Sequence, residues 1–432
     1  METFNPGYCT IESAIIANAS GESETITGLI GRFDIQQSLA SSTFSGSLDI
    51  LDGIGLLSSL PIRGEESLKI KLKSHDLQTE LSLDLQVIEI SNVSIQKESG
   101  DQYAYTLGFI SKTSWGAVRE SVITAFRNKP ASYCAKTIFK DYFAKNLGSR
   151  KFNYETSHGD MRIIIPDYNP IQAMNFLCAK AFTNKSASSS YRFFETVYGY
   201  SWVTDEWLLE NAQKNEIKKL KYSPVVDRNP TSGSTIIETL IEFETANHVN
   251  TLKDMNAGAY RNTVMEIDLT THKKRTFDYD YLRKKKNYKG MQGQVGGISG
   301  MKHTESFIKK TFTEDNAPQY IVYRDWSPIG MEQKPGQVPR DDQHMTEVIQ
   351  NRTAYNYHLR ENMCSGEIRG RLDIHPGEVV NLSILEPDAA LEGKQNKRLS
   401  GLYLIYRTAH NINGTDLVTS IDMVKFDWET AV

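Results

Sequence analysis

The sequence predicts an α+β protein with an antiparallel β domain at each end of the chain. Residues 8–111 contain repeated segments in which apolar and polar residues alternate, and residues 367–426 contain several more. Such alternation is typical of strands with one buried face. Between these regions, residues 113–205 carry apolar residues at helical spacing, and residues 247–352 are mostly polar. The N-terminal region suits a small barrel or sandwich, followed by a helix-rich α+β module and a polar insertion.

The composition is that of an ordinary globular protein. The chain has 432 residues, of which 39% are hydrophobic and 24% charged, and its formal net charge is −4. This length allows about two to four domains. The acidic balance argues against a whole-chain role in gripping nucleic acid, for which a basic excess is expected. No stretch approaches the roughly 20 apolar residues of a membrane span, and no basic segment followed by an apolar core marks a signal peptide.

The cysteines are scattered and form no CxxC pair. This pattern predicts free thiols in a protein made in the cytosol, with disulfides between distant cysteines as the alternative. The cysteines are Cys9, Cys134, Cys178 and Cys364.

The stretch from Phe44 to Glu66 organises the first β region. Alternation from Ser45 to Leu51 predicts a strand, and Asp52-Gly53 is typical of a turn. Residues 55–62 then form a short apolar plug ahead of the next strand. The other strands expected in this region cover residues 8–16, 25–37, 68–73, 81–87 and 103–109.

The middle of the chain predicts three helices and a hairpin. The first helix is expected over 113–126, the second from Pro130 to Leu147, and the third from the cap Asn169 to Ala181. An aromatic hairpin about Gly199 follows. The residues at helical spacing in the first helix are Trp115, Val118, Val122 and Phe126.

The C-terminal region returns to strand patterns at 367–374, 379–385, 402–412 and 416–426. Pro376 and Gly377 are expected to turn the chain between the first two of these strands. Asn413-Gly414 lies between the last two and is among the strongest hairpin signals. A strand over 235–244 is expected to complete this domain across the insertion, which makes the domain discontinuous.

Two segments in the insertion contain residues that could bind a ligand. The glycine-rich run 290–300 does not match a phosphate-binding loop, because Lys302 does not directly follow Gly300. We interpret it, and the basic run Lys284–Lys286, as exposed loops. The run Asp341–His344 is metal-like by composition alone, and no pair of histidines has metal-ligand spacing.

Recognisable catalytic motifs are also missing from the sequence. Glu65 and Glu66 are neighbours, so on a strand they point to opposite faces and do not share a glycosidase site. The aromatic hairpin could offer a sugar-binding platform, although packing against the preceding helices is the simpler interpretation. We therefore assign no catalytic, cofactor-binding or metal-binding residue. The aromatic residues concerned are Tyr191, Phe193, Phe194, Tyr198, Tyr200 and Trp202.

Residues 33–66 carry a motif that resembles a known family. In order, the motif has a glycine before an alternating strand, an aspartate turn, a leucine pair, Leu-Pro-Ile and a glycine followed by a glutamate. The residue that usually separates the last two is absent here. This motif resembles the N-terminal tube-like domain of baseplate hub proteins in contractile-tailed bacteriophages, the T-even-type hub family. The matching residues are Gly46, Asp52, Leu56, Leu57, Leu60, Pro61, Ile62, Gly64 and Glu65.

The end of the chain also resembles that family. Pro376-Gly377-Glu378 precedes Val379-Val380, and the strand Ser400–His410 follows. This order is similar to the hub fold shared with type VI secretion spike proteins. The resemblance implies two tube-like β-barrels per chain: residues 1–112, and residues 206–246 with 353–432. The helix-rich module then covers 113–205 and the insertion 247–352.

The resemblance further implies a non-enzymatic structural role. Such hubs are homotrimeric rings that adapt a sixfold tail tube to a threefold central spike and leave a channel for genome ejection. The implied partners are the tail tube or tube-initiator protein, the central spike protein and other baseplate wedge proteins. DNA is expected to pass through the lumen without specific binding, past an acidic or mixed wall. The protein would be made in the host cytoplasm, reside in the virion tail baseplate and not insert into membranes.

Two alternatives from other classes stay open on sequence alone. One is a tail-associated peptidoglycan hydrolase, although no catalytic constellation is recognisable. The other is a carbohydrate-binding receptor module, which the aromatic hairpin suggests.

Overall fold

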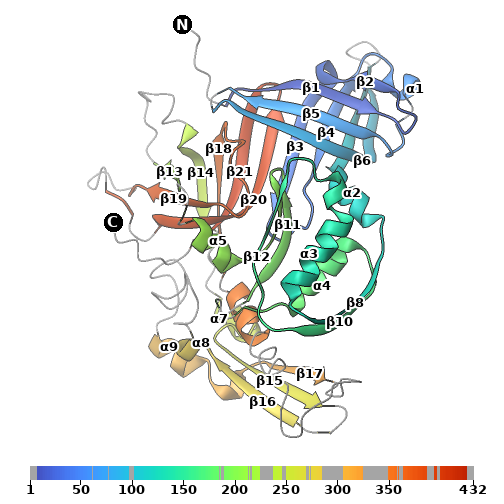
Figure 1. Cartoon of the computed structure of the whole chain (residues 1–432). Helices are drawn as coiled ribbons and strands as arrows, with labels where there is room; N and C mark the ends of the chain where they lie inside the picture. Colours follow the sequence, from blue (N-terminus) through green and yellow to red (C-terminus); the bar gives the residue numbers. More distant parts are fainter. Residues whose placement is uncertain are drawn as a thin grey trace.

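A computed structural model gives the arrangement of the chain (Figure 1). The structure describes residues 7–60, 62–75, 77–96, 102–183, 185, 189–212, 214, 217–223, 237–245, 250–268, 272, 274–284, 305–324, 349–357, 359, 363–386, 394–396 and 399–425.

A single 13-stranded sheet joins the two ends of the chain. Neighbour by neighbour, its main path runs through β14 (Leu240–Thr245), β18 (Met363–Arg369), β21 (Asp416–Lys425), β20 (Gly401–Asn413), β3 (Ile30–Ser38), β4 (Ser45–Asp52), β7 (Gln102–Ser111), β6 (Thr79–Gln96), β5 (Ser67–Ser74), β1 (Cys9–Ala17) and β2 (Ser23–Thr25). Beside this path, β19 (Val379–Ile384) pairs with β20, and β13 (Lys218–Tyr222) pairs with β19.

The N-terminal and C-terminal β regions meet at one strand pair. Residues Arg32–Ser38 of β3 pair antiparallel with Arg407–Asn413 of β20. These strands, blue and red in Figure 1, lie side by side although nearly the whole chain separates them in sequence. The two β regions expected from the sequence are therefore parts of one continuous sheet, which is mostly antiparallel.

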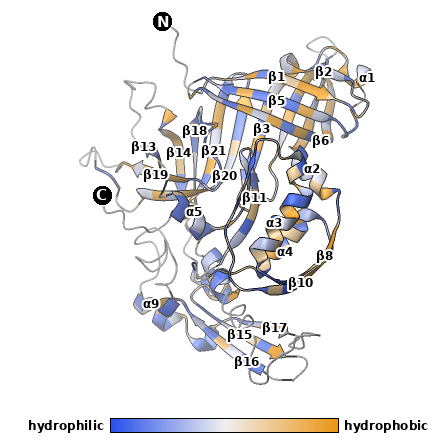
Figure 2. Ribbon diagram, viewed as in Figure 1, coloured by the Kyte–Doolittle hydropathy of each residue, from blue (hydrophilic) through white to orange (hydrophobic). Residues whose placement is uncertain are grey.

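Side-chain alternation explains why these segments form strands. In β5, Leu68, Ile70 and Leu72 are buried, whereas Lys69 and Lys71 between them are exposed. Figure 2 shows the same alternation of hydrophobic and hydrophilic residues along the neighbouring strands. This period of two is confirmed for the strands that the sequence predicts around residues 8–16, 45–51, 68–73, 81–87 and 103–109.

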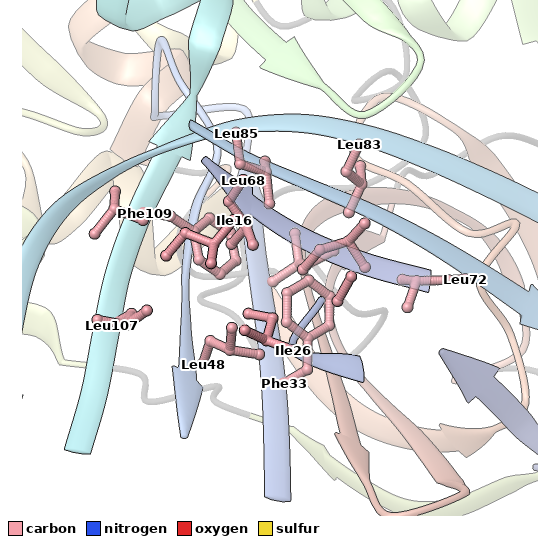
Figure 3. Close-up of a cluster of buried hydrophobic side chains, with 14 of the residues drawn as sticks. Ile16, Ile26, Phe33, Leu48, Leu68, Leu72, Leu83, Leu85, Leu107 and Phe109 are labelled. Atoms are coloured by element: carbon pink, nitrogen blue, oxygen red, sulfur yellow. The ribbon is translucent and has the colours of Figure 1, made fainter. Parts of the chain in front are cut away.

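The N-terminal strands enclose a hydrophobic core, part of which Figure 3 shows. Phe33 of β3 and Phe109 of β7 stack in it with ring centroids 5.4 Å apart. Ile412 and Leu417 of the β20–β21 hairpin belong to the same core. The C-terminal strands enclose a second core, which contains Tyr403 from the other end of β20. The long hairpin therefore contributes to both cores.

Isolated bridges join distant parts of the sheet. Tyr8, just before β1, bridges to Asp416 of β21, and Lys221 of β13 bridges to Thr239 ahead of β14. The N-terminal half therefore curves back onto the tip of the β20–β21 hairpin, and the C-terminal half curves back on itself. Within the described residues, single bridges rather than full ladders close the two circuits, so neither is a closed barrel by strand pairing.

A helix-rich module packs beside this sheet. Its helices are α2 (Lys112–Val118), α3 (Ala131–Tyr142) and α4 (Pro170–Lys180). Asn169 caps α4 in a capping box with Gln172, with distances of 2.8 and 3.2 Å, as the sequence predicts. Its strands are β8 (Val122–Lys129), β9 (Lys151–Tyr154), β10 (Met161–Tyr168), β11 (Tyr191–Thr196) and β12 (Gly199–Thr204).

The prediction of one helix over 113–126 is wrong. α2 ends at Val118, and Val122 begins β8, which pairs with β10. Val122 and Phe126 are four residues apart, a spacing that fits one face of a strand as well as one face of a helix. The β-branched residues at 122–124 then favour the strand. Ser111 caps the start of α2, because its hydroxyl accepts the N–H of Ser114.

Other segments also differ from the sequence prediction in detail. The strand expected over 367–374 is β18, which ends at Arg369, and the strand expected over 235–244 begins only at Leu240. The second helix ends at Tyr142 and is followed by a 3₁₀ turn, η2 (Ala144–Asn146).

The strand expected over 25–37 is broken by a 3₁₀ turn, η1 (Thr27–Leu29), between β2 and β3. The final hairpin turns at Gly414-Thr415, one residue later than expected, because Asn413 still pairs with Asp416. Gly414 has φ +61°, and a glycine with positive φ at the first central position is typical of a type II′ turn.

The insertion contains a small three-stranded sheet. β15 (Arg261–Asp268) pairs with β16 (Lys274–Asp280) and with β17 (Gln319–Arg324). The glycine-rich run, Lys285, Lys286, Asp341–His344 and Pro61 lie outside the described residues. No helix in the described part of the chain has the length and apolar character needed to cross a membrane.

Candidate functional site: the polar face of the sheet

One exposed face of the sheet is hollowed and polar. Residues directly opposite in an antiparallel pair share a face, so Asp34 lies beside Ser47, and Asp49 lies beside Thr106. This face continues across β20 and β21. The hollow is lined by Arg32, Asp34, Gln36, Ser47, Asp49, Asn92, Thr106, Ala409, Asn411 and Ser420.

Acidic side chains predominate on this polar face. The hydroxyl of Thr106 donates to Asp49 at 2.7 Å, and Arg32 pairs with Asp34 at 2.8 Å. From β14 to the half of β6 beyond its bulge, the pairing register places charged residues on the same face, whereas Asp52 and Lys425 are buried on the other face. The acidic residues of the polar face are Asp34, Asp49, Glu89, Glu242, Glu244, Glu367, Asp416 and Asp422, and its basic residues are Arg32, Arg369 and Arg407.

The charges of this polar face disfavour binding of a polyanion. Lysine and arginine side chains bind phosphates by releasing their counterions, whereas carboxylates repel them. The few arginines here are partly neutralised: Arg32 by Asp34, and Arg407 by Asp422 at 3.9 Å. The residues are also polar enough to keep the face hydrated.

The aspartate of the 44–66 motif organises the turn after β4. Asp52 is buried, and its carboxylate accepts the backbone N–H groups of Ile54 at 3.1 Å, Leu56 at 2.9 Å and Leu57 at 3.2 Å. These bonds hold the first turn of α1 (Leu56–Ser59), whose N-terminal N–H groups have no intrahelical partner. Asp52 therefore has a structural role at the end of the sheet.

The leucines of the motif anchor that turn in the first core. Leu56 and Leu60 are buried, and Leu57 packs against the same core while partly exposed. The apolar plug expected from the sequence is confirmed.

Gly46 of the motif meets its neighbours too closely for any side chain. A Cβ atom there would lie 2.0 Å from the Asp34 carbonyl oxygen and 2.5 Å from the Phe109 ring. Gly64 has φ +91°, a conformation that favours glycine. Both glycines are therefore required by the backbone.

Of the neighbouring glutamates Glu65 and Glu66, the second holds the turn before β5. Glu65 is exposed, whereas Glu66 is buried. The Glu66 carboxylate accepts the N–H groups of Arg63 at 2.8 Å, Gly64 at 2.9 Å and Glu65 at 3.0 Å. A glutamate between a glycine turn and an amphipathic strand is the sequence signal that could have identified this role.

The turn with Pro376 and Gly377 borders a cleft of about 350 Å³. Gly377 has φ +92° and faces the ring of Phe194. After it, Glu378 receives two bonds from the Lys218 ammonium, at 2.9 and 3.0 Å. Lys218 also pairs with Asp373 at 3.1 Å. Burial opposes ionisation of Asp373, but Arg371 and Lys218 lower its pKa below the usual value. These pairs fix β13 against β19.

The aromatic hairpin is part of the fold's interior. Tyr191, Phe193, Phe194, Tyr200 and Trp202 are buried. Tyr198 of the same hairpin is partly exposed, and its ring packs at a tilt against His375, with centroids 4.9 Å apart. The packed hairpin is confirmed, and Phe194 and Tyr198 are the rings of this set that line the cleft beside Gly377. All four cysteines are free and buried, which confirms the thiol prediction. The described residues contain no cluster of metal-ligating side chains.

We compared the sequence and the fold with those of known proteins. No protein-family model matches the sequence, and no curated protein matches it. A tail protein from Neisseria meningitidis matches it in structure with a TM-score of 0.51 over 96% of each chain, at 9% sequence identity. The chain shares the fold of this tail protein. The resemblance to tail proteins found in residues 33–66 is thereby confirmed at the level of the fold.

Two other solved structures match with TM-scores below 0.5. A 43 kDa tail protein of prophage MuSo2 from Shewanella oneidensis has a TM-score of 0.49 at 10% identity, covering 96% of this chain and 97% of that one. A component of the E. coli type VI secretion system, with structural similarity to bacteriophage T4 tail proteins, has a TM-score of 0.44 at 8% identity. This match covers 97% of this chain and 77% of the other chain.

Proposed function

We propose that the chain is a structural component of a tail: a baseplate hub that forms a homotrimeric ring. The shared tail-protein fold is the observation that carries this proposal. The ring would adapt a sixfold tail tube to a threefold central spike, without catalysis or a cofactor. Its partners would be a tail tube or tube-initiator protein, the spike protein and other baseplate proteins. It would act in the virion tail baseplate after synthesis in the host cytoplasm.

The organisation of the sheet supports the symmetry of this proposal. Each chain has two hydrophobic cores under one sheet, one in each β region. Three chains would therefore present six similar β units around one axis. A heterologous interface whose rotation closes gives such a ring.

The polar face supports a channel as the second part of the proposal. In a ring, this face would line the lumen, and its carboxylates would repel the DNA backbone. DNA would then pass without specific contacts. The proposal assigns Asp34, Asp49 and Glu89 to that wall, since β3, β4 and β6 place them on one face.

Light scattering and averaged electron images test the ring. The purified protein, alone and with a candidate spike, is expected to give a mass near three times 48.8 kDa and ring-shaped particles with six densities. A monomer in both samples, without rings, would contradict the trimeric hub and favour tests on peptidoglycan gels and on host-cell surfaces.

Reversing charge on the polar face tests the channel wall. The variant Asp34→Lys/Asp49→Lys/Glu89→Lys is expected to retain duplex DNA at low salt and release it as salt rises, because each new lysine can neutralise a phosphate. The wild-type protein is expected to retain none. The matched control is Glu120→Lys/Asp141→Lys/Asp160→Lys, with the same charge change at exposed positions of the helix-rich module. Equal retention of DNA by both variants would show that the polar face is not the channel wall.

A further inference from the structure

The two halves of the sheet repeat one strand order. The first unit runs β3-β4-β7-β6-β5-β1, and the second runs β14-β18-β21-β20-β19-β13. Position by position, β6 therefore corresponds to β20, and β3 corresponds to β14. In both units the two middle strands form a long hairpin, which is β6–β7 in the first unit and β20–β21 in the second.

Local features support this correspondence. Val87 of β6 donates its N–H to the Glu66 carbonyl at 2.9 Å, and Ile405 of β20 donates to the Glu378 carbonyl at 2.8 Å. Directly after these residues, each long strand has a bulge, between Val87 and Glu89 and between Ile405 and Arg407. Thus β6 and β20 leave their partners β5 and β19 at the same point.

The long strands also resemble each other in extending past that point. Beyond its bulge, β20 continues as Arg407–Asn413 and pairs with β3 of the first unit. This pairing is the join between the two units of one chain. The corresponding half of β6 is Ile88–Gln96, and the strand that corresponds to β3 is β14.

Both of these corresponding edges are open. In the described part of the chain, Ile88–Gln96 pairs only with β7, and Leu240–Thr245 pairs only with β18. The open half of β6 exposes Val93 and Ile95, each 57% accessible, and β14 exposes Ile241. Exposed apolar side chains along an unpaired edge are a liability that proteins usually cover.

We propose that Ile88–Gln96 of one copy pairs antiparallel with β14 of the next copy. This contact between chains would repeat the β20–β3 contact within each chain. The occupant of each open edge is therefore a second copy of this protein. The proposal rests on the trimeric ring proposed above and names its interface.

The placement of the two edges suits a ring. In Figure 1, β6 and β14 lie on opposite sides of the sheet. A contact between these two different edges is head-to-tail. Copies joined in this way form a closed ring when the rotation across the contact equals the rotation across the β20–β3 pair within each chain. Pairing also continues the acidic polar face from one copy to the next, because both segments border it.

The variant Val93→Lys/Ile95→Lys tests the interface by mass. Lysines on an edge strand oppose pairing with another chain, and both positions are exposed enough to accept them in the monomer. We expect the wild-type protein to be trimeric and this variant to be a folded monomer, with the circular dichroism of the wild type and a cooperative unfolding transition. The control Ile123→Lys, on β8 at a position 76% exposed, is expected to stay trimeric.

Cross-linking tests the pairing directly. The double variant Ile95→Cys/Ile241→Cys, treated with a short bis-maleimide, is expected to give covalent closed trimers, since the native cysteines are buried. Ile123→Cys/Ile241→Cys is the control and is expected to give none. A trimer that persists in the lysine variant and does not cross-link overturns this interface but leaves the ring. A wild-type protein that is monomeric at every concentration overturns both.

Discussion

Replacing Arg150 by methionine is expected to lower the free energy of unfolding by about 3–5 kcal/mol, the range for breaking one partner of a buried ion pair. Its partner Glu195, on β11, has no exposed surface. Arg150 reaches it from the loop before β9 at 2.6 Å. Without the guanidinium, the carboxylate would be buried without a compensating charge.

The other contacts of Glu195 explain why this site matters to the fold. Its second oxygen accepts hydrogen bonds from Thr43 at 3.0 Å and Ser114 at 2.8 Å. Thr43 lies between β3 and β4, and Ser114 lies on α2. One carboxylate therefore ties the helix-rich module to the sheet, and Arg150 balances its charge.

Urea unfolding of a small variant set separates this charge effect from packing. Arg150→Met/Glu195→Met is expected to recover much of the loss, because both charges are removed together. Lys151→Met, at an exposed neighbouring position, is expected to change stability by less than about 0.5 kcal/mol. An Arg150→Met protein as stable as Lys151→Met would contradict the assignment.

The sequence predicts those parts of the fold that depend on local patterns. Alternation identifies β4 and β5, because their buried residues recur at every second position. The cap Asn169 identifies the start of α4 through its own hydrogen bonds. At 122–126 the pattern is ambiguous, since a four-residue spacing serves both a helix and a strand, and pairing with β10 decides in favour of the strand.

Local sequence patterns do not show which residues far apart in the sequence lie in contact. The join of β3 to β20 depends on the pairing of residues about 370 positions apart, such as Gln37 with Thr408. Likewise, Glu66 and Glu65 look alike in the sequence, and only the turn's N–H groups select Glu66. The polar face needs the same long-range register, so its residues could be predicted as exposed but not as neighbours.

His410 on β20 is expected to make the fold sensitive to acid. Its Nδ1 lies 2.9 Å from the Thr419 hydroxyl, which itself donates to the Arg371 carbonyl at 3.1 Å. Thr419 therefore accepts the proton of Nδ1. The Nε2 atom is buried without a hydrogen-bond partner, so a proton there would place a charge in the interior without compensation.

Burial lowers the pKa of His410 to about 4, from 6.5, while Asp373 and His375 act on it in opposite directions. The unfolded chain consequently binds the proton more tightly than the folded one. Stability from this group is full above pH 6.5 and falls as the pH decreases toward 4, by about 3 kcal/mol in total.

Urea unfolding between pH 7 and pH 4 measures this loss. His410→Asn keeps a side-chain N–H for the Thr419 hydroxyl but cannot gain a proton, so its stability is expected to fall by about 3 kcal/mol less than that of the wild type across this range. Other groups titrate in both proteins, and the difference between the two curves isolates His410. Parallel curves would contradict the burial of an unprotonated imidazole. His410 lies in the segment of β20 that pairs with β3, so its protonation destabilises the pairing between the two units. Acid is therefore expected to open the sheet first at this strand pair.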